Sequence, residues 1–227
     1  MDSTSTLRSD FATRLYSKLA STEAGNNLFL SPFSIQVALA MCAAGAKGET
    51  RRVLADLIGA PQGVEEQNRH YSGLLKSVYG DGKRPFELAM ANALWGQKGY
   101  DFKPAFQEAI AEFYDEALHL VNFRAKPDEA VKTINAWVSD KTQARIKDLI
   151  SRDLIDDNTR LILTNAIYFK GQWEKVFAKT ATKDGDWHGS KATSKVPMMA
   201  RRVAISTTRT VASRPSIFLT WAGNFLC

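Results

Sequence analysis

The three histidines are the residues of this 227-residue chain best suited to acid–base or metal chemistry. A histidine titrates near neutral pH and is a common metal ligand. His70 lies in a weakly patterned helical segment, His119 in a strand pattern and His188 in a predicted loop. None of them belongs to an HExxH, CxxC or similar ligand spacing. We therefore expect no metal site and no cofactor.

Motifs for nucleophilic catalysis or phosphate binding give no better support for an enzyme. The sequence contains no G-x-S-x-G elbow, and the glycines of "GNN" and "GAKGET" have neither P-loop nor dinucleotide-binding spacing. Cys42 lies within the apolar run "ALAMCAAGA", which predicts a buried thiol. With Cys227 as the only other cysteine, a disulfide framework is excluded. We predict that the chain is not an enzyme.

Polar residues set inside apolar elements are the remaining candidates for function. They are Ser31 and Ser34 at the start of one predicted helix, Asn92 in one strand, and Thr164 and Asn165 in another. A buried amide without partners costs about 1–3 kcal/mol, so these groups should bond to one another or to nearby backbone. Two interpretations remain open. The network either fixes one packing arrangement, or it holds a sheet closed where its strands must separate.

The elements that must position these residues form a mixed series of helices and strands. Periodicity predicts helices over residues 7–20, 31–44, 48–58, 65–79, 103–114 and 126–142, and strands over residues 28–30, 86–97, 116–123 and 160–173. Ser31 and Pro32 are expected to be the N-cap and first residue of the second helix. This order of elements predicts a single α and β domain over residues 1–200.

Hydrophobic patterning indicates how four elements are buried. Residues 35–44 are apolar on almost every face, so their helix should run through the interior. Both alternating sets of the strand 86–97 are apolar or small, which requires cover on both faces. The strand 160–173 is the most apolar, and we expect it to be central in its sheet. In the third helix we expect the inward residues to be Val53, Leu54, Leu57 and Ile58.

Four segments of the chain resemble signature segments of the serpin family. They are "NNLFLSPFSIQVALAMCAAGAKGET", "FELAMANALWGQ", "NAWVSDKTQARIKDLI" and "LILTNAIYFKGQWEKVF", in the family's order and spacing, within residues 7–199. The resemblance implies an α+β serpin fold, with many helices around three sheets, A, B and C. It places the strands 86–97, 116–123 and 160–173 in sheet A, and a helix over residues 128–139 across that sheet's face.

The resemblance also implies a function and a set of site residues. Ser31, Ser34 and Asn165 match the polar cluster beneath sheet A that is called the shutter, and Trp173 matches the tryptophan of the breach at its top. Serpins inhibit serine proteases: the protease cleaves an exposed reactive-centre loop and is trapped as an acyl-enzyme while the loop inserts into sheet A. The expected partner of the family is therefore a serine protease.

The last 27 residues depart from the serpin pattern. "RRVAISTTRTVASRPSIFLTWAGNFLC" contains no acid and aligns with none of the family's later strands, its reactive-centre loop or the histidine that completes the shutter. We therefore expect a C-terminally truncated, non-inhibitory serpin. Its partial serpin domain spans residues 1–199, and an aberrant tail spans residues 200–227. The uncovered sheet edges of such a chain should promote self-association.

Charge and hydropathy limit the other partners. Four charges of the net charge of +6 come from arginines in the tail. The net charge that remains is typical of an ordinary solvated surface, so we expect no nucleic-acid partner. No apolar run approaches the roughly 20 residues that cross a bilayer, so we expect no membrane partner. The resemblance to a largely secreted family implies an extracellular location, whereas the absence of a visible signal peptide leaves a cytoplasmic alternative.

A non-inhibitory binding protein is the alternative function. Four basic residues resemble the region where some serpins bind glycosaminoglycans, namely Arg69, Lys76, Lys83 and Arg84. Glu65, Glu66 and Asp81 lie near these bases in the sequence, which also fits a plain solvated face.

Overall fold

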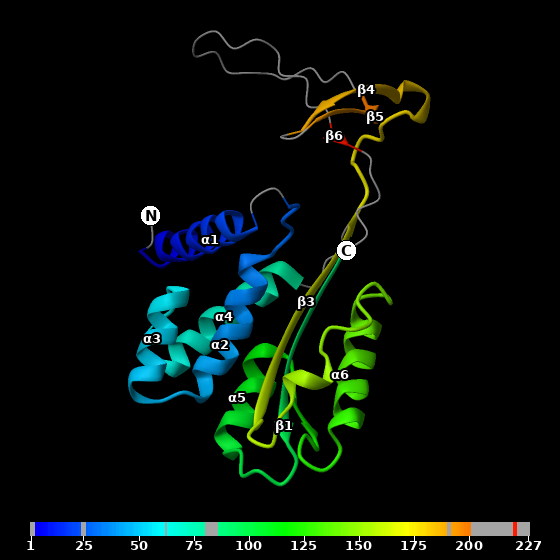
Figure 1. Ribbon diagram of the computed structural model, residues 1–227. Coiled ribbons are helices and arrows are strands. Elements are labelled where there is room, and N and C mark those ends of the chain that lie inside the picture. The colour runs from blue at the N-terminus through cyan, green and yellow to red at the C-terminus, as the bar shows by residue number, and fades with distance from the viewer. Residues whose placement is uncertain are drawn as a thin grey trace. The chain divides into compact units, whose positions relative to one another are not determined.

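The structure is a computed structural model that describes residues 3–23, 26–61, 63–79, 86–189, 192–200 and 220–221 (Figure 1). The chain forms two compact units, Met1–Lys170 and Gly171–Cys227. No helix among the described residues is long and apolar enough to span a membrane.

The first unit contains all six predicted helices and three of the four predicted strands. The helices are α1 (Ser3–Thr22), α2 (Pro32–Gly45), α3 (Gly48–Ile58), α4 (Val64–Tyr79), α5 (Pro104–Tyr114) and α6 (Pro127–Lys141), and the strands are β1 (Phe86–Gln97), β2 (Leu118–Val121) and β3 (Leu161–Gly171). The strand predicted at 28–30 is wrong, because this segment has no assigned secondary structure. A strand needs a neighbouring strand for its backbone groups, and the described residues provide none there.

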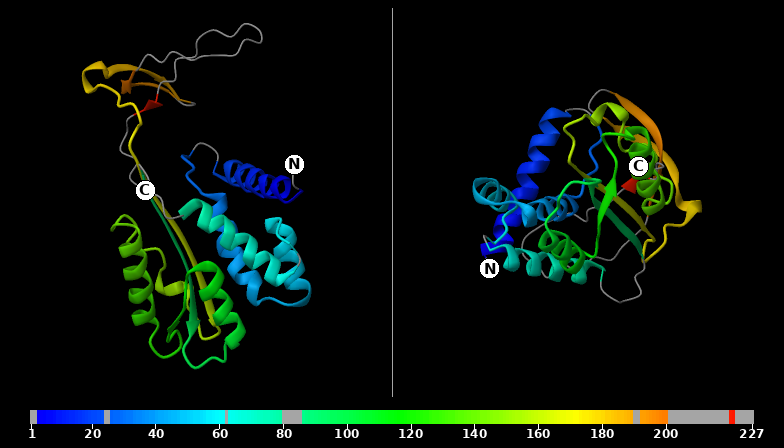
Figure 2. Two further views of the ribbon diagram at one scale, coloured as in Figure 1. Left: turned by 180° about the vertical axis from the view of Figure 1, so that it is seen from behind. Right: turned by 90° about the horizontal axis from the view of Figure 1, so that it is seen from below.

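The three strands form one sheet in the order β2-β1-β3. β1 runs parallel to β2, with Leu94 opposite Leu118. β3 runs in the opposite direction to β1: the Gln97 N–H donates to the Arg160 carbonyl at 2.9 Å, whereas Lys170 pairs with Glu87 at the other end. Figure 2 shows β1 and β3 side by side. The prediction of a central β3 is therefore wrong within the described residues, since apolarity reports cover on a strand's faces and not partners at its edges.

β1 is covered on both faces, as its sequence predicts. Leu94 belongs to a core cluster with Met41 of α2, whereas the neighbouring Trp95 belongs to a second cluster with Ile134 of α6. Successive strand residues point to opposite faces, so α2 packs on one face of β1 and α6 on the other (Figure 1). The prediction that the helix at 128–139 lies across the sheet is confirmed.

α2 begins as its sequence predicts. The Ser31 hydroxyl accepts a hydrogen bond from the Ser34 N–H at 3.3 Å, and Pro32 is the first helical residue. Buried residues on several faces of α2 include Gln36, Val37 and Ala40, which confirms an interior helix.

α3 buries only part of the predicted face: of the four residues predicted to point inward, Ile58 is buried and Leu54 is partly buried. The predicted inward residues Val53 and Leu57 are exposed, and the buried stripe is Arg51, Ala55 and Ile58. The Arg51 guanidinium is buried because it donates hydrogen bonds to the Ala43 carbonyl at 3.1 Å and to Gln67 Oε1 at 2.5 Å.

The second unit contains an antiparallel sheet in the order β4-β5-β6. Its strands are β4 (Lys183–His188), β5 (Thr193–Met199) and β6 (Thr220–Trp221). Met199 lies opposite Thr220. A short part of the predicted tail therefore pairs with the segment before it, while residues 201–219 and 222–227 lie outside the described residues.

The outer edge of β3 predicts self-association. In the described sheet this edge has no partner strand, and Phe169 near its end is 58% exposed beside Phe86. Exposed apolar strand edges recruit other chains. We expect concentration-dependent oligomers in size-exclusion chromatography with light scattering, and fewer of them after Phe169→Lys. Leu154→Lys, which changes an exposed leucine away from the edge, is the control. A monodisperse wild-type monomer would contradict this expectation.

Candidate functional site

The predicted polar residues of three elements meet on the α2 face of the sheet. Asn165 Nδ2 of β3 donates to Ser34 Oγ of α2 at 2.6 Å and also to Asn92 Oδ1 of β1. Ser34 Oγ donates to Asn92 Oδ1 at 3.3 Å, and Asn92 Nδ2 donates to the Ser34 carbonyl at 3.1 Å. We call Ser34, Asn92 and Asn165 the polar cluster.

Burial makes the polar cluster energetically significant. Ser34 is fully buried, Asn92 is 4% exposed and Asn165 is partly buried. Because these side chains are buried or partly buried, each lost partner leaves a polar group unsatisfied. The cluster thus ties β1 to β3 and both strands to the start of α2. The predicted member Ser31 caps α2 from outside the cluster, and within the described chain its side chain makes no hydrogen bond to Asn92 or Asn165.

A second polar link joins the same two strands on the α6 face. Trp95 Nε1 of β1 donates to Thr164 Oγ1 of β3 at 3.0 Å, and Thr164 Oγ1 lies 3.4 Å from the Ala93 carbonyl, to which it donates. Both side chains are buried. Neighbouring residues Thr164 and Asn165 therefore secure β3 to β1 on opposite faces.

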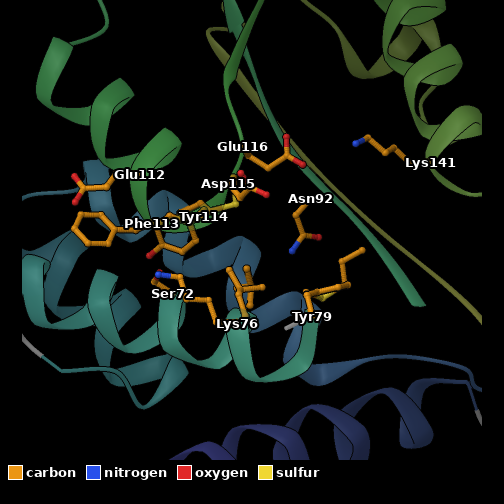
Figure 3. Close-up of a pocket in the computed structure, with 14 residues that line it drawn as sticks. Ser72, Lys76, Tyr79, Asn92, Glu112, Phe113, Tyr114, Asp115, Glu116 and Lys141 are labelled. Atoms are coloured by element: carbon orange, nitrogen blue, oxygen red, sulfur yellow. The ribbon is translucent and has the colours of Figure 1, made fainter. Parts of the chain in front are cut away.

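A buried network beside the sheet was not predicted. It joins Arg51 of α3, Gln67 and Asn68 of α4, and Tyr114 of α5. Gln67 Nε2 donates to the Ala40 carbonyl at 2.9 Å, and the Tyr114 hydroxyl donates to Asn68 Oδ1 at 2.9 Å. Burial raises the pKa of Tyr114 (Figure 3) to about 12, so the hydroxyl stays a donor. Arg51 shares one helical face with Ala55 and Ile58, and this spacing was the feature of the sequence that could have indicated the burial of Arg51.

The histidines occupy three different environments. His119 stacks on Trp95 with ring centroids 4.6 Å apart, His70 lies edge-on to Tyr71, and His188 Nδ1 is 3.0 Å from Thr193 Oγ1. In the part of the chain that the structure describes, no group of three or more histidine, cysteine, aspartate or glutamate residues could hold a metal ion. Cys42 is partly buried, and burial raises the pKa of its thiol.

His119 should make folding sensitive to acid. Burial, followed by the nearby Lys141 ammonium, lowers the pKa of His119 below its ordinary 6.5. The unfolded chain then binds the proton at higher pH than the folded chain, so stability falls as the pH drops from about 6.5 through the folded pKa. Burial raises the pKa of Glu116, which acts in the opposite sense and loses stability as the pH rises. Glu116 lies 3.9 Å from His119 Nε2.

We expect His119→Phe, which keeps an aromatic ring against Trp95, to lose less stability on acidification than the wild-type chain. Urea unfolding at several pH values below about 7 measures this difference. Glu116→Gln is the control, because it removes the opposing titration and should steepen the loss toward low pH. Parallel pH profiles for His119→Phe and the wild type would contradict the assignment.

The other predicted site residues are not members of the polar cluster. Trp173 belongs to the second unit, where it is exposed and packs edge-on against Phe177. Arg69 and Lys76 are exposed on α4, seven residues apart and thus on one face. Arg69 forms an ion pair with Glu65 one turn away. Lys83 and Arg84 lie outside the described residues.

A model of the family described as "Serpin (serine protease inhibitor)" matches residues 6–216. This chain belongs to the serpin family, and its α+β fold is the serpin fold. The match extends beyond Met199, where the signature segments had led us to expect its end.

Similar proteins and solved structures support the assignment to the serpin family. Leukocyte elastase inhibitor of Bos taurus is 38% identical over 203 residues, which are 89% of this chain and 53% of that protein. An uncharacterized serpin-like protein of Thermococcus kodakarensis is 38% identical over 189 residues, 83% of this chain and 43% of that protein. Cleaved Serpin 42Da aligns with a TM-score of 0.77 at 35% identity, covering 84% of this chain and 51% of its own. Uncleaved ovalbumin aligns with a TM-score of 0.80 at 25% identity, covering 88% and 57%. The chain thus spans about half the length of the relatives that it matches.

Proposed function

We propose that this chain forms the strand-accepting half of a serpin-type inhibitor of serine proteases. The observation that carries the proposal is the polar cluster, which holds β1, β3 and α2 together by hydrogen bonds that can be exchanged. Serpin inhibition requires a new strand to enter the sheet. In the described sheet β3 offers an outer edge for such a strand, and the cluster lies beside it. We propose that Ser34 and Asn165 act as shutter residues, Ser31 positions them as the cap of α2, and Trp173 is the breach residue.

The same proposal holds that residues 1–227 alone trap no protease. None of these residues resembles a reactive-centre loop, which is the segment that a protease would cleave. Elastase-, trypsin- and chymotrypsin-like enzymes incubated with the 227-residue chain should give no SDS-resistant complex. A covalent band with the unaltered chain would contradict this part of the proposal. The proposal assigns the chain no catalytic activity.

A chimera tests the positive part. Residues 1–199 are joined to the C-terminal half of the bovine leukocyte elastase inhibitor, a relative that carries the inhibitor name. If the sheet accepts a strand, this chimera forms an SDS-resistant complex with an elastase-like protease. Asn165→Ala in the chimera should change the share of inhibitor that is cleaved without forming a complex. A folded chimera that is only cleaved would contradict the proposal, and the intact bovine inhibitor is the control.

A non-inhibitory binding protein is the second candidate, favoured by one observation. The solved structure of cleaved kallistatin complexed with heparin aligns at 30% identity with a TM-score of 0.77. Arg69 and Lys76 share a face of α4, although Arg69 is already paired with Glu65. If this face binds glycosaminoglycans, the chain elutes from heparin above physiological salt, and the Arg69→Ala/Lys76→Ala variant elutes earlier. Flow-through of the wild-type chain would exclude this candidate.

The location remains a proposal. The comparisons give no support to the extracellular expectation, and the cytoplasmic alternative is the one that we retain. Subcellular fractionation of cells that express the chain would decide between them.

A further inference from the structure

The edge of β5 that faces β6 is only partly occupied. β6 pairs with β5 at two positions, where Met198 lies opposite Trp221 and Met199 lies opposite Thr220 (Figure 1). Residues 193–197 of β5 have no partner on this edge among the described residues, although β4 pairs with all of them on the other edge. The open part of the edge offers backbone donors and acceptors to a further strand.

The second unit lacks the burial that a stable sheet needs. None of its residues in the ranges 171–189 and 192–200 is buried. A two-stranded hairpin is marginally stable at best in water, whereas three strands with one apolar face can be stable. The two residues of β6 provide little of that third strand. The pair β4 and β5 therefore requires a longer strand on the open edge of β5.

The pair β4 and β5 has one apolar and one polar face. Trp187 of β4 shares the first face with Val196 and Met198 of β5, because side chains alternate along each strand and directly opposite residues point the same way. Trp187 is 49% exposed. The other face carries an ion pair between Asp186 and Lys195, whose charged atoms lie 2.8 Å apart. A strand that completes this sheet should be apolar on the first face and polar on the second.

The residues that follow β6 in the sequence fit the open edge in register. If the antiparallel register of β6 continues, residues 222–226 come opposite residues 197–193. Cys227 then comes opposite Ala192, the residue just before β5. Residues 222–226 thus supply one partner for each unpaired position of the edge.

The residue types of this segment also match the two faces. In the continued register Phe225 comes opposite Ser194 and falls on the face of Trp187. The small serine between them leaves space for two large rings on neighbouring strands. Asn224 comes opposite Lys195, on the face of the ion pair. The segment is therefore aromatic where the sheet is apolar and carries an amide where the sheet is charged.

We propose that the open edge of β5 binds residues 222–226 of this chain as an antiparallel extension of β6. Backbone hydrogen bonds hold the segment, and Phe225 covers the exposed ring of Trp187. Pro197 has no N–H, so it contributes only its carbonyl to the pairing. The family model matches residues 6–216, so this strand lies outside the serpin match, and its test involves no protease.

The bound segment would give the second unit a sheet of three strands of similar length. It would also occupy backbone groups of β5 that otherwise recruit strands from other chains. The role that we assign to residues 222–226 is thus to cap the edge of β5 from within the same chain.

Disulfide trapping in the 227-residue chain tests the register. The proposal places Cys227 opposite Ala192, and directly opposite residues of an antiparallel pair lie within disulfide distance. In a Cys42→Ala background, Ala192→Cys should therefore form a disulfide with Cys227 of the same molecule under mild oxidation. Ser194→Cys, which changes another exposed residue two positions away, is the matched control. Its disulfide should form about tenfold more slowly, because the two thiols lie beyond bridging distance.

Hydrogen exchange gives an independent readout without new cysteines. In a chain that stops after Trp221, the amides of residues 193–196 that point to this edge should exchange about tenfold faster than in the 227-residue chain, because the removed segment no longer protects them. The amides of α6, which belongs to the first unit, should exchange equally in both chains.

Three results would overturn the proposal. The first is equal disulfide formation in the two cysteine variants, and the second is equal exchange of the β5 amides in the two chains. The third is a disulfide between molecules at micromolar concentration, which would assign the edge to a second copy of the chain.

Discussion

Replacement of Trp95 by alanine is expected to lower the free energy of unfolding by about 3–5 kcal/mol, the usual cost of removing a large buried aromatic side chain. Trp95 is 2% exposed and lies at the centre of the core cluster between β1 and α6. Its ring stacks on His119 and meets Trp137 edge-on at 5.6 Å. Alanine would leave a cavity that three elements line. Urea unfolding followed by far-ultraviolet circular dichroism measures the loss.

Two milder variants separate packing from hydrogen bonding at this position. Trp95→Phe keeps most of the ring but removes the Nε1–H donor, and Thr164→Val removes its acceptor. Each should cost about 1–3 kcal/mol, and the double variant should cost less than their sum because the two residues share one bond. A Trp95→Ala loss within the range of a surface substitution, about 0.5 kcal/mol, would contradict this description of the core.

Replacement of Asn92 by alanine is the second large expected effect. Asn92 accepts hydrogen bonds from Ser34 and Asn165 and donates one to the Ser34 carbonyl. Its loss leaves buried polar groups with fewer partners, and we expect a decrease in stability of about 2–3 kcal/mol. The decrease should fall mainly on the attachment of β3 to β1, because the amide joins these strands.

Asn135→Ala is the matched control for Asn92. Asn135 also exchanges two hydrogen bonds through its amide, both with the backbone of Ile150, but it lies on α6 outside the polar cluster. Both variants should unfold at lower urea concentration than the wild-type chain. An Asn92→Ala chain as stable as the wild type would mean that the polar cluster does not hold the sheet.

The sequence predicted the polar cluster because its residues break otherwise apolar patterns. Asn92 and Asn165 stand in strands that must be covered on both faces, so their amides had to find partners inside the protein. Ser34 lies in the first turn of a helix that has no polar face. These constraints predicted which residues would form hydrogen bonds with one another. They did not predict that Ser31 would cap α2 without joining the polar cluster.

Other features depend on neighbours that local pattern does not reveal. The exposure of Val53 and Leu57 follows from the burial of Arg51, whose acceptors come from α2 and α4, and sequence pattern alone favoured the aliphatic face. The strand order is also non-local, because β3 is the more apolar strand and yet the pairing of the strands makes β1 the middle one. Local pattern also could not show that the segment 28–30 has no partner strand among the described residues. In each case tertiary contacts decided what local propensity could not.

Native-state hydrogen exchange of the Asn92→Ala and Asn135→Ala variants tests most directly whether the polar cluster keeps β1 and β3 together. The two chains are compared at matched global stability. We predict that the backbone amides of Leu163, Asn165 and Ala166 exchange faster in Asn92→Ala than in Asn135→Ala, with α6 amides showing no such excess. Equal exchange of the β3 amides in the two variants would contradict the account.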